Sequence, residues 1–399
     1  MVEQFAVGSG QGAVGKEQLA AGNCGYEFKI FCGNKDMDDS LLQEVVFDKW
    51  VNYNAHTKVW YSSTGNILPV LQQEIKTEKP DHLFIVGIYD WKFNFKPLLF
   101  CKGVKKIISV RGMLHPGALS QKSFKKKIYL QLWKLLGLHK QHVFHASDAE
   151  EQKYIQQVFG ADAKVLVAAN FPGVLHVQPV VKKELGYLKL VSIALISPMK
   201  NILLVIQSLA EMGIKINNKS FHNDEILPSA ETRVSRFAQD NESGSGQDDK
   251  TVIEYNIYGP VKDKKYWEEC AALIKKMPAN IQVNYYGDIA PEKIEDALAE
   301  NHVFILPSKS ENFGHAIYEA LSAGRPVITS NTTPWNNLEA AKAGKNITLT
   351  DTQEMVKAIG FFAGMGQEEI EEWSRGARVY AEEAVDVEAI RRQYEEMFR

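Results

Sequence analysis

The residues of this 399-residue chain that are best suited to chemistry are two glutamates, Glu311 and Glu319. They lie in the segment Ser308–Trp335, where an apolar run, Val303–Leu306, leads into a polar loop and then into a helical pattern that begins at Gly314–His315. A carboxylate accepts hydrogen bonds from two neighbouring hydroxyls of a sugar or ribose. A helix N-terminus offers free N–H groups and a positive dipole end to a phosphate. Together these groups would suit every polar part of a nucleotide sugar.

Two glutamates at this spacing also occur by chance on an ordinary solvated helix, and that alternative remains open. A site is favoured by what surrounds the pair. The strand pattern comes directly before the loop, Gly314 comes at the start of the helix, and the small-residue helix ends at Gly324 and Pro326. The order strand, loop, helix, strand is typical of parallel α/β proteins.

The composition is that of a globular chain that is long enough for two domains, with 45% hydrophobic and 24% charged residues. No apolar run approaches the roughly 18 residues that a membrane span needs. We expect no signal peptide, because the first residues lack a basic segment followed by an apolar core. The four cysteines form no CxxC pair. We expect them to be reduced thiols in the cytosol.

Short apolar strands alternate with helices along the chain, which predicts two doubly wound α/β domains that meet around Phe171–Tyr187. We predict a first domain over residues 1–173, a linker over 174–186, a second domain over 187–380 and a final helix within 381–399. The polar stretch 217–250 is predicted to be a disordered insertion in the second domain. The predicted strands are Glu27–Cys32, Lys58–Tyr61, His82–Val86, Lys106–Val110, His142–His145, Lys164–Ala168, Lys189–Ala194, Glu254–Tyr258, Ile281–Tyr285, Val303–Leu306 and Val327–Thr329. The predicted helices are Ile67–Lys76, Lys122–Leu136, Asp148–Phe159, Asn201–Met212, Lys264–Lys276, Pro291–Glu300 and His315–Ala323.

The segment Ser308–Trp335 resembles the donor-site motif of retaining glycosyltransferases of family 4, of the bacterial surface-polysaccharide type. The family pattern is a Glu, seven residues and a second Glu, with a Phe-Gly step between them, and the continuations ALSAGRPVITS and TPW are also similar. The resemblance covers residues 251–399 well and residues 25–216 loosely. It implies the GT-B fold, in which two Rossmann-like domains face each other across a cleft and the last helix, here Val387–Phe398, crosses back to the first domain.

The resemblance also implies a set of site residues. Glu311 and Arg111 are the expected catalytic residues, with Glu311 on the donor sugar. The expected donor-binding residues are Lys200, Gly259, Ile289, Asn312, Phe313, Gly314, His315 and Glu319. Family members place the nucleobase against the backbone of the segment that matches Tyr286–Ile289.

One position departs from the family. Members usually have an Arg and, five residues later, a Lys, both on the diphosphate. Lys200 matches the Lys, but Leu195 stands at the Arg position. We expect Arg111 to substitute, because it follows the predicted strand KKIISV. The RGML segment that starts at Arg111 is similar to that of bacterial polysaccharide transferases, although many relatives have His there. We therefore predict no histidine base, and His115 is favoured as a structural residue. The departing diphosphate would take the acceptor proton.

Two further motifs leave alternatives open. Gly10–Gly15 matches GxGxxG, which fits a glycine-rich loop of the family, a disordered terminus or a dinucleotide site. Asp36 and Asp38 form a D-x-D, which in transferases of another fold holds a divalent metal. A solvated loop is favoured here, because GT-B sites use cationic side chains and a helix terminus instead. We predict that no cofactor or metal is required.

The charge is unevenly distributed. The first 183 residues hold 23 Lys and Arg against 16 Asp and Glu, a net charge of +7, whereas the rest of the chain has −10. Within Lys122–Lys140, lysines alternate with large apolar residues, as in a basic amphipathic helix on an anionic membrane surface. A core-packed helix with a solvated lysine face explains the pattern equally well. No nucleic-acid motif accompanies the charge, so we expect no nucleic-acid partner.

These observations predict a retaining glycosyltransferase. It would move a sugar from a nucleotide diphosphate sugar to a glycan acceptor, with a lipid-linked oligosaccharide expected. The expected pathway is the biosynthesis of bacterial surface polysaccharide, such as lipopolysaccharide, capsule or exopolysaccharide, and the expected location is the cytoplasm, at the inner membrane face. Two alternatives are a sugar-nucleotide epimerase with the same fold and a polysaccharide-assembly protein whose catalysis is weakened by Leu195.

Overall fold

The structure is a computed structural model. It describes residues 2–7, 26–35, 41–42, 45–120, 123–171, 173, 175–217, 251–349 and 352–399. The chain divides into two compact units. The first comprises Met1–Phe171 with Val387–Arg399, and the second comprises Pro172–Asp386. Several predictions lie outside the described residues: the Gly10–Gly15 motif, Asp36 and Asp38, and the insertion beyond residue 217.

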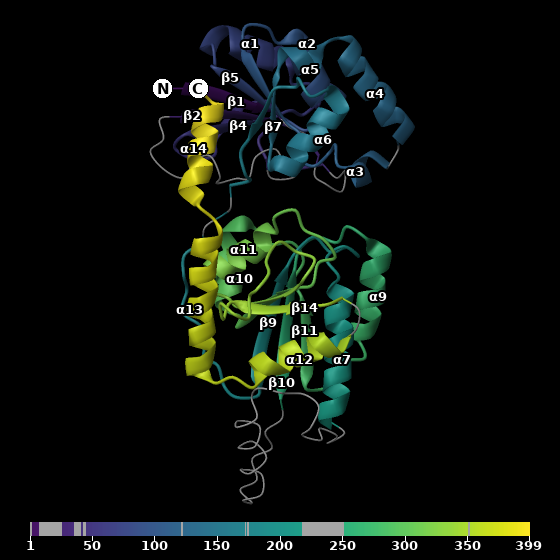
Figure 1. Cartoon of the computed structure of the whole chain (residues 1–399), viewed down its shortest axis with the longest axis vertical. Coiled ribbons are helices and arrows are strands. Elements are labelled where there is room, and N and C mark those ends of the chain that lie inside the picture. The colour runs from purple at the N-terminus through teal and green to yellow at the C-terminus, as the bar shows by residue number, and fades with distance from the viewer. Residues whose placement is uncertain are drawn as a thin grey trace, which may run out of the picture. The chain divides into compact units, whose positions relative to one another are not determined.

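The described residues of the first unit form an eight-stranded sheet in the order β3-β4-β2-β1-β5-β6-β7-β8. Among these strands, β3 alone runs antiparallel to its neighbour (Figure 1). The strands are β1 (Val2–Val7), β2 (Tyr26–Cys32), β3 (Trp50–Asn52), β4 (Thr57–Tyr61), β5 (His82–Val86), β6 (Lys105–Ser109), β7 (Val143–Ala146) and β8 (Val165–Val167). The sequence favours a strand only weakly at β1. The backbone of β1 nevertheless pairs in parallel with both β2 and β5, so it lies in the interior of the sheet.

Helices of the first unit pack on this sheet and on one another. They are α1 (Leu68–Glu78), α2 (Lys96–Phe100), α3 (Pro116–Ser120), α4 (Ser123–Leu135), α5 (Leu138–Gln141), α6 (Ala149–Phe159) and α14 (Val387–Met397), with a π-helical turn, η1 (Trp91–Phe95). The predicted helices α1, α4 and α6 are confirmed, whereas the short α2, α3 and α5 carry too little periodicity to be predicted. Helix α6 begins where the Asp148 carboxylate accepts from the Glu151 N–H, and it ends at Gly160, which has a φ of 109°.

The C-terminal helix α14 belongs to the first unit. Its end contributes Met397 and Phe398 to a small buried cluster with Phe84 and Ile107. The ring of Phe398 lies 5.9 Å from that of Phe84 and 6.3 Å from that of Tyr26. These contacts fix the last residues of the chain on the first sheet.

The second unit contains a parallel six-stranded sheet in the order β11-β10-β9-β12-β13-β14. Its strands are β9 (Tyr187–Ile193), β10 (Val252–Tyr258), β11 (Ile281–Tyr285), β12 (Val303–Leu306), β13 (Val327–Ser330) and β14 (Gly344–Ile347). Its helices are α7 (Ile202–Asn217), α9 (Lys264–Ile274), α10 (Ile294–Ala299), α11 (His315–Ser322), α12 (Thr352–Ala363) and α13 (Gln367–Ala384), with a 3-10 turn, η2 (Pro291–Lys293). Helices α7, α9 and α12 lie on one side of the sheet, and α10, α11 and α13 lie on the other (Figure 1). Every predicted strand and helix of this unit is found, and β14 and α12 were not predicted.

The segment predicted to be a linker is packed on the second unit instead. The guanidinium of Arg325, which is fully buried, donates to the carbonyls of Gln178 at 3.1 Å and Pro179 at 3.0 Å. The ammonium of Lys183 donates to the Met365 carbonyl at 2.8 Å, and burial lowers the pKa of Lys183 to about 8. Spacing alone could not reveal these bonds, because each joins the segment to a residue that is distant in the sequence, Arg325 or Met365.

No helix in the described ranges combines the length and the apolar character that crossing a bilayer requires.

The packing of α14 gives a first prediction. Phe398→Ala should lower the free energy of unfolding of the first unit by about 3 kcal/mol, because a nearly buried ring leaves a cavity. Phe124→Ala, which removes a ring that is 74% exposed, is the matched control and should change stability by less than about 0.5 kcal/mol. Denaturant unfolding measures both. Equal effects of the two changes would contradict the docking of α14.

Candidate functional site

Two of the predicted site residues, Lys200 and Glu311, lie at the topological switch point of the second sheet. Strands β9 and β12 are neighbours, but the chain leaves β9 towards β10 on one side and β12 towards β13 on the other. In open α/β sheets ligands bind at this point, beyond the carboxyl ends of the strands. The loop after β9 carries Lys200, and the loop after β12 carries Glu311. The topology therefore brings together two residues that are 111 positions apart.

Lys200 and Glu311 form an ion pair across these two loops. The Lys200 Nζ lies 2.5 Å from Oε1 of Glu311, and the side chains are 25% and 11% exposed. The Ser308 hydroxyl donates to the same Oε1 at 2.6 Å. Because both donors reach Oε1, the other oxygen, Oε2, is the one available to accept from a ligand. The pair thus keeps a charged carboxylate in a fixed orientation at the carboxyl edge of the sheet.

The loop after β12 is held from both sides. On one side, the hydroxyls of Ser330 and Thr332 donate to the Ser308 carbonyl, at 2.5 and 3.1 Å. On the other, the Lys309 N–H donates to the Met199 carbonyl at 2.8 Å. Loop residues that are bonded to two neighbouring segments lose little further freedom when a ligand binds.

Gly314 sets the start of helix α11. Its φ is 82°, in the left-handed region, and a Cβ there would lie 3.0 Å from Nε1 of Trp335. That indole nitrogen donates to the Phe313 carbonyl at 2.5 Å. The first turn of α11 carries no acidic residue, so the positive end of the helix dipole is not offset by a carboxylate of that turn. Buried residues of α11, including Ile317, anchor the helix in the core.

Phe313 is a structural anchor of this helix start. Its ring centroid lies 4.8 Å from that of His315, 5.8 Å from that of Tyr318 and 5.4 Å from that of Trp335. Asn312, by contrast, is exposed. Of the predicted donor residues in this loop, Phe313 therefore shapes the backbone, and Asn312 is placed where it can meet a solvent-borne ligand.

Glu319 lies one turn after His315 and on the same face of α11. Its carboxylate is half-buried beside the start of the second unit, where a Cβ added to Gly173 would lie 3.1 Å from Oε1. A side chain at residue 173 would therefore crowd this carboxylate.

The predicted nucleobase segment is also formed by the second unit. The Gly259 N–H donates to the Gly287 carbonyl at 2.6 Å, and the rings of Tyr258 and Tyr286 stack with centroids 4.8 Å apart. Gly259 has a φ of 129°, and a Cβ there would come within 2.0 Å of the Ala194 carbonyl oxygen, so only glycine fits. Ile289 is partly buried against the core of this unit. The loops after β10 and β11 are thus in contact, and the first also touches the loop after β9.

Leu195, at the position of the family's Arg, lies in the loop after β9 and is partly exposed. Lys200 is the cation that this loop contributes to the ion pair with Glu311.

Arg111 belongs to the first unit, where it follows β6 in a strained turn. Its φ of 54° is unusual for a residue with a side chain, and its guanidinium donates to Oδ1 of Asn170 at 2.9 Å. The turn is held by the carboxylate of Glu151, which accepts from the N–H groups of Gly112 at 2.5 Å and Ser147 at 2.7 Å. Backbone strain that is kept by specific bonds is common at functional sites.

The nearby histidines have structural environments. His145 is buried, and its two ring nitrogens lie 2.8 Å from the Ser109 hydroxyl and 2.8 Å from the Ala168 carbonyl oxygen. Burial lowers the pKa of His145 to about 4, so it is neutral at pH 7. The His115 ring meets the Tyr154 ring edge-on at 5.2 Å.

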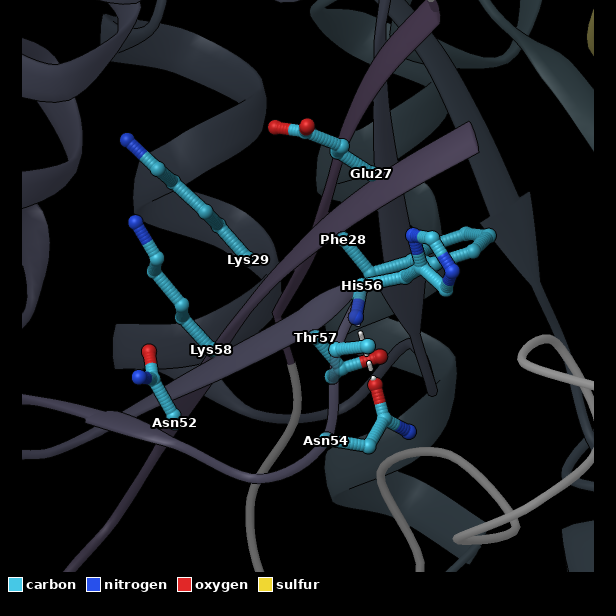
Figure 2. Close-up of a pocket in the computed structure, with 9 residues that line it drawn as sticks. Glu27, Phe28, Lys29, Asn52, Asn54, His56, Thr57 and Lys58 are labelled. Atoms are coloured by element: carbon cyan, nitrogen blue, oxygen red, sulfur yellow. Dashed lines mark hydrogen bonds between the residues drawn. The ribbon is translucent and has the colours of Figure 1, made fainter. Parts of the chain in front are cut away.

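A pocket that the sequence did not indicate lies in the first unit, with a volume of about 270 Å³. It is lined by the β3–β4 hairpin and the start of β2, at the amino ends of β2 and β4 (Figure 2). Lys29 and Lys58 extend side by side along it, and the His56 N–H donates to Oδ1 of Asn54 at 2.9 Å (Figure 2). None of the predicted site residues lines this pocket. Within the described residues, no group of three or more His, Cys, Asp and Glu side chains is arranged to hold a metal.

Sequence reasoning missed the residues that support the donor loop. Ser308, Ser330 and Thr332 bond to the loop or within it, and Trp335 fixes the start of α11. Their signal is their position at or just after the carboxyl ends of the buried strands β12 and β13, where ligands bind in parallel sheets.

The chain is similar to known proteins in both sequence and fold. Residues 245–369 match the family described as Glycosyl transferases group 1. Over 70 residues the chain is 33% identical to "Sulfoquinovosyl transferase SQD2" of Arabidopsis thaliana, a match that covers 18% of this chain and 13% of that protein. The chain thus spans a small part of the length of this curated relative.

Solved structures match over the whole chain. HepE of Anabaena, in complex with UDP and glucose, has a TM-score of 0.61 at 15% identity, with 100% of this chain and 99% of that chain covered. The fold is GT-B. Sucrose-phosphate synthase of Thermosynechococcus elongatus has a TM-score of 0.63 at 13% identity, with coverage of 100% and 98%. WaaG, described as a glycosyltransferase involved in lipopolysaccharide biosynthesis, has a TM-score of 0.56 at 11% identity, with coverage of 100% and 99%. The GT-B prediction, with two Rossmann-like domains, is confirmed.

A second prediction concerns the ion pair. In a double-mutant cycle of Lys200→Met and Glu311→Gln, the two side chains should couple by about 1–3 kcal/mol. Either single change already breaks the partly buried, charge-assisted hydrogen bond, so the second change cannot remove it again. Denaturant unfolding of the four proteins measures the coupling. Lys345→Met with Glu339→Gln is a control pair in the same unit, in which Glu339 is 66% exposed, and it should couple more weakly. A coupling below about 0.5 kcal/mol for the first pair would contradict the contact.

Proposed function

We propose that this protein is a retaining glycosyltransferase of family 4 that moves a sugar from a nucleotide diphosphate sugar to a glycan acceptor. The observation that carries the proposal is the Lys200–Glu311 pair at the switch point of the second sheet, beside the N-terminus of α11. A group 1 glycosyltransferase domain over residues 245–369 supports it. HepE, whose fold is the same, was solved with UDP and glucose. UDP-sugars are therefore the first donors to test.

Each polar group of such a donor finds a partner of suitable chemistry. In the proposal, the diphosphate lies on the N–H groups at the start of α11 and takes the ammonium of Lys200. Oε2 of Glu311 accepts hydrogen bonds from hydroxyls of the donor sugar. The carboxylate of Glu319, one turn after the start of α11, accepts hydrogen bonds from the ribose hydroxyls. The nucleobase lies against the backbone near Gly259 and Ile289.

The proposed reaction needs no protein nucleophile. The acceptor oxygen bonds to the anomeric carbon on the face from which the diphosphate departs, and the departing diphosphate takes the proton of the acceptor hydroxyl. Negative charge then grows on the diphosphate, where Lys200 and the α11 dipole stabilise it. We propose that Arg111 also stabilises the negative charge of the departing diphosphate. We propose further that no metal is required, since Lys200, Arg111 and the α11 dipole supply the positive charge.

We propose a lipid-linked oligosaccharide of a bacterial surface polysaccharide as the acceptor, taken up at the cytoplasmic face of the inner membrane. The fold shared with WaaG, a glycosyltransferase involved in lipopolysaccharide biosynthesis, supports this acceptor class.

The third prediction tests the roles of the two carboxylates. Glu311→Gln should lower the rate of transfer about ten- to a hundredfold, because a charge-assisted acceptor for donor-sugar hydroxyls is lost. Glu319→Gln should mainly raise the KM for the donor by a similar factor. Steady-state transfer from a panel of nucleotide sugars, with and without EDTA, measures both. Wild-type kinetics in both variants would remove the assignment of the donor site. Epimerisation of the donor without transfer would identify an epimerase, and full loss of activity in EDTA would contradict catalysis without a metal.

The fourth prediction uses the departure at residue 195. Leu195→Arg should tighten the binding of a nucleoside diphosphate about tenfold or more, because a second cation would reach the diphosphate. Leu195→Met is the matched control, since it keeps the apolar character and should leave the affinity unchanged. Calorimetric titration with UDP measures the dissociation constants. Weaker binding by the Arg variant than by the Met variant would show that the diphosphate lies elsewhere.

A further inference from the structure

Helix α4 presents a stripe of large apolar side chains to solvent. Phe124, Ile128 and Leu135 are 74%, 57% and 84% exposed. Their spacings of four and seven residues place them on one face of the helix. Single exposed apolar residues are ordinary, but three on one helix face form a continuous patch of the kind that marks an interaction surface. In the first unit α4 lies at the periphery (Figure 1).

The opposite face of α4 holds the helix in the core of the first unit. Trp133 is fully buried and Leu130 is 7% exposed. Trp133 packs beside Phe159 and Tyr129, with ring centroids at 5.9 and 6.1 Å and the ring planes tilted. An amphipathic helix needs one apolar face for its own core, so the exposed stripe is a second apolar face that folding does not explain. Trp133, which would have contacted lipid if it faced outward, contributes to the core instead.

Positive charge flanks the stripe on both sides. Lys125 lies on one side of it along the helix surface, and Lys127 and Lys134 lie on the other, and all three are exposed. Lys126 is used differently, because it donates to the Ala118 carbonyl and lies 5.1 Å from the centre of the Tyr89 ring. The stretch Trp91–Ser147 holds twelve basic residues and no acidic one, so no acidic side chain of α4 or its flanking segments offsets these lysines.

We propose that the first unit docks on an anionic lipid surface through α4. The side chains of Phe124, Ile128 and Leu135 enter the boundary between headgroups and acyl chains, and the flanking lysines lie on the anionic headgroups. Nucleic acid fits less well, because its phosphate backbone would bind the lysines but would leave the apolar stripe exposed to water. The inference is independent of the sugar donor, and it would bring a lipid-linked acceptor within reach of the enzyme.

The test is flotation of the full chain with lipid vesicles. The wild type should float with phosphatidylcholine vesicles that contain phosphatidylglycerol at low salt, and it should be released as salt rises, since exposed charges are screened. It should not float with phosphatidylcholine alone. Failure to float on anionic vesicles at low salt, or equal binding to both vesicle types, would overturn the proposal.

Two variants separate the apolar and the charged parts. Changing Phe124, Ile128 and Leu135 to Ser should lower partitioning by at least about tenfold while leaving thermal stability unchanged, because these side chains are exposed. Changing Lys125, Lys127 and Lys134 to Gln should lower partitioning by on the order of a hundredfold, since each lysine near the surface is worth about fivefold.

The matched control changes three exposed lysines of the second unit, Lys264, Lys265 and Lys276, to Gln. It alters the net charge by the same amount and should float like the wild type. Flotation of the serine variant like the wild type would overturn the proposal. A wild-type dimer in solution that is lost in the serine variant would also overturn it, because the stripe would then bind a second copy of the chain. Tighter binding to single-stranded nucleic acid than to anionic vesicles would do the same.

Discussion

The contact between Lys200 and Glu311 is the interaction on which the rest of the site depends. It joins the loop after β9 to the loop after β12, the two strands between which the second sheet changes direction. A partly buried carboxylate is tolerated because an ammonium and the Ser308 hydroxyl both bind it. The pair also places the Lys200 ammonium where a diphosphate would bind. When the ammonium binds the diphosphate instead, the Glu311 carboxylate can accept hydrogen bonds from sugar hydroxyls.

This contact is useful only because the backbone around it is fixed. Gly314 takes a left-handed conformation that lets α11 start directly after the loop, and the indole of Trp335 bonds to the carbonyl just before it. Gly259 allows two loops to approach within a distance that a Cβ would forbid. The site is therefore assembled from strand ends and glycine turns, and the cost of ordering it is met during folding and not during binding.

The sequence predicted the repeating strands and helices of both units, because alternating apolar runs and helical periodicity are local signals. It did not predict that Lys200 and Glu311 touch, since that depends on the strand order of a sheet. It placed Trp133 among residues that could face a membrane, and the packing of α4 buries it. The segment expected to be a linker is bound by Arg325, a contact that local composition does not encode.

The central claim is that a nucleoside diphosphate binds at the start of α11, beside Lys200. A crystal structure of the protein with UDP, grown in the presence of EDTA, tests it most directly. The account predicts the β-phosphate within hydrogen-bond distance of the N–H groups of Gly314 and His315, with the Lys200 ammonium moved from Glu311 to a phosphate oxygen. A nucleotide bound elsewhere, such as in the pocket beside His56 and Lys58, with the Lys200–Glu311 pair intact, would contradict it.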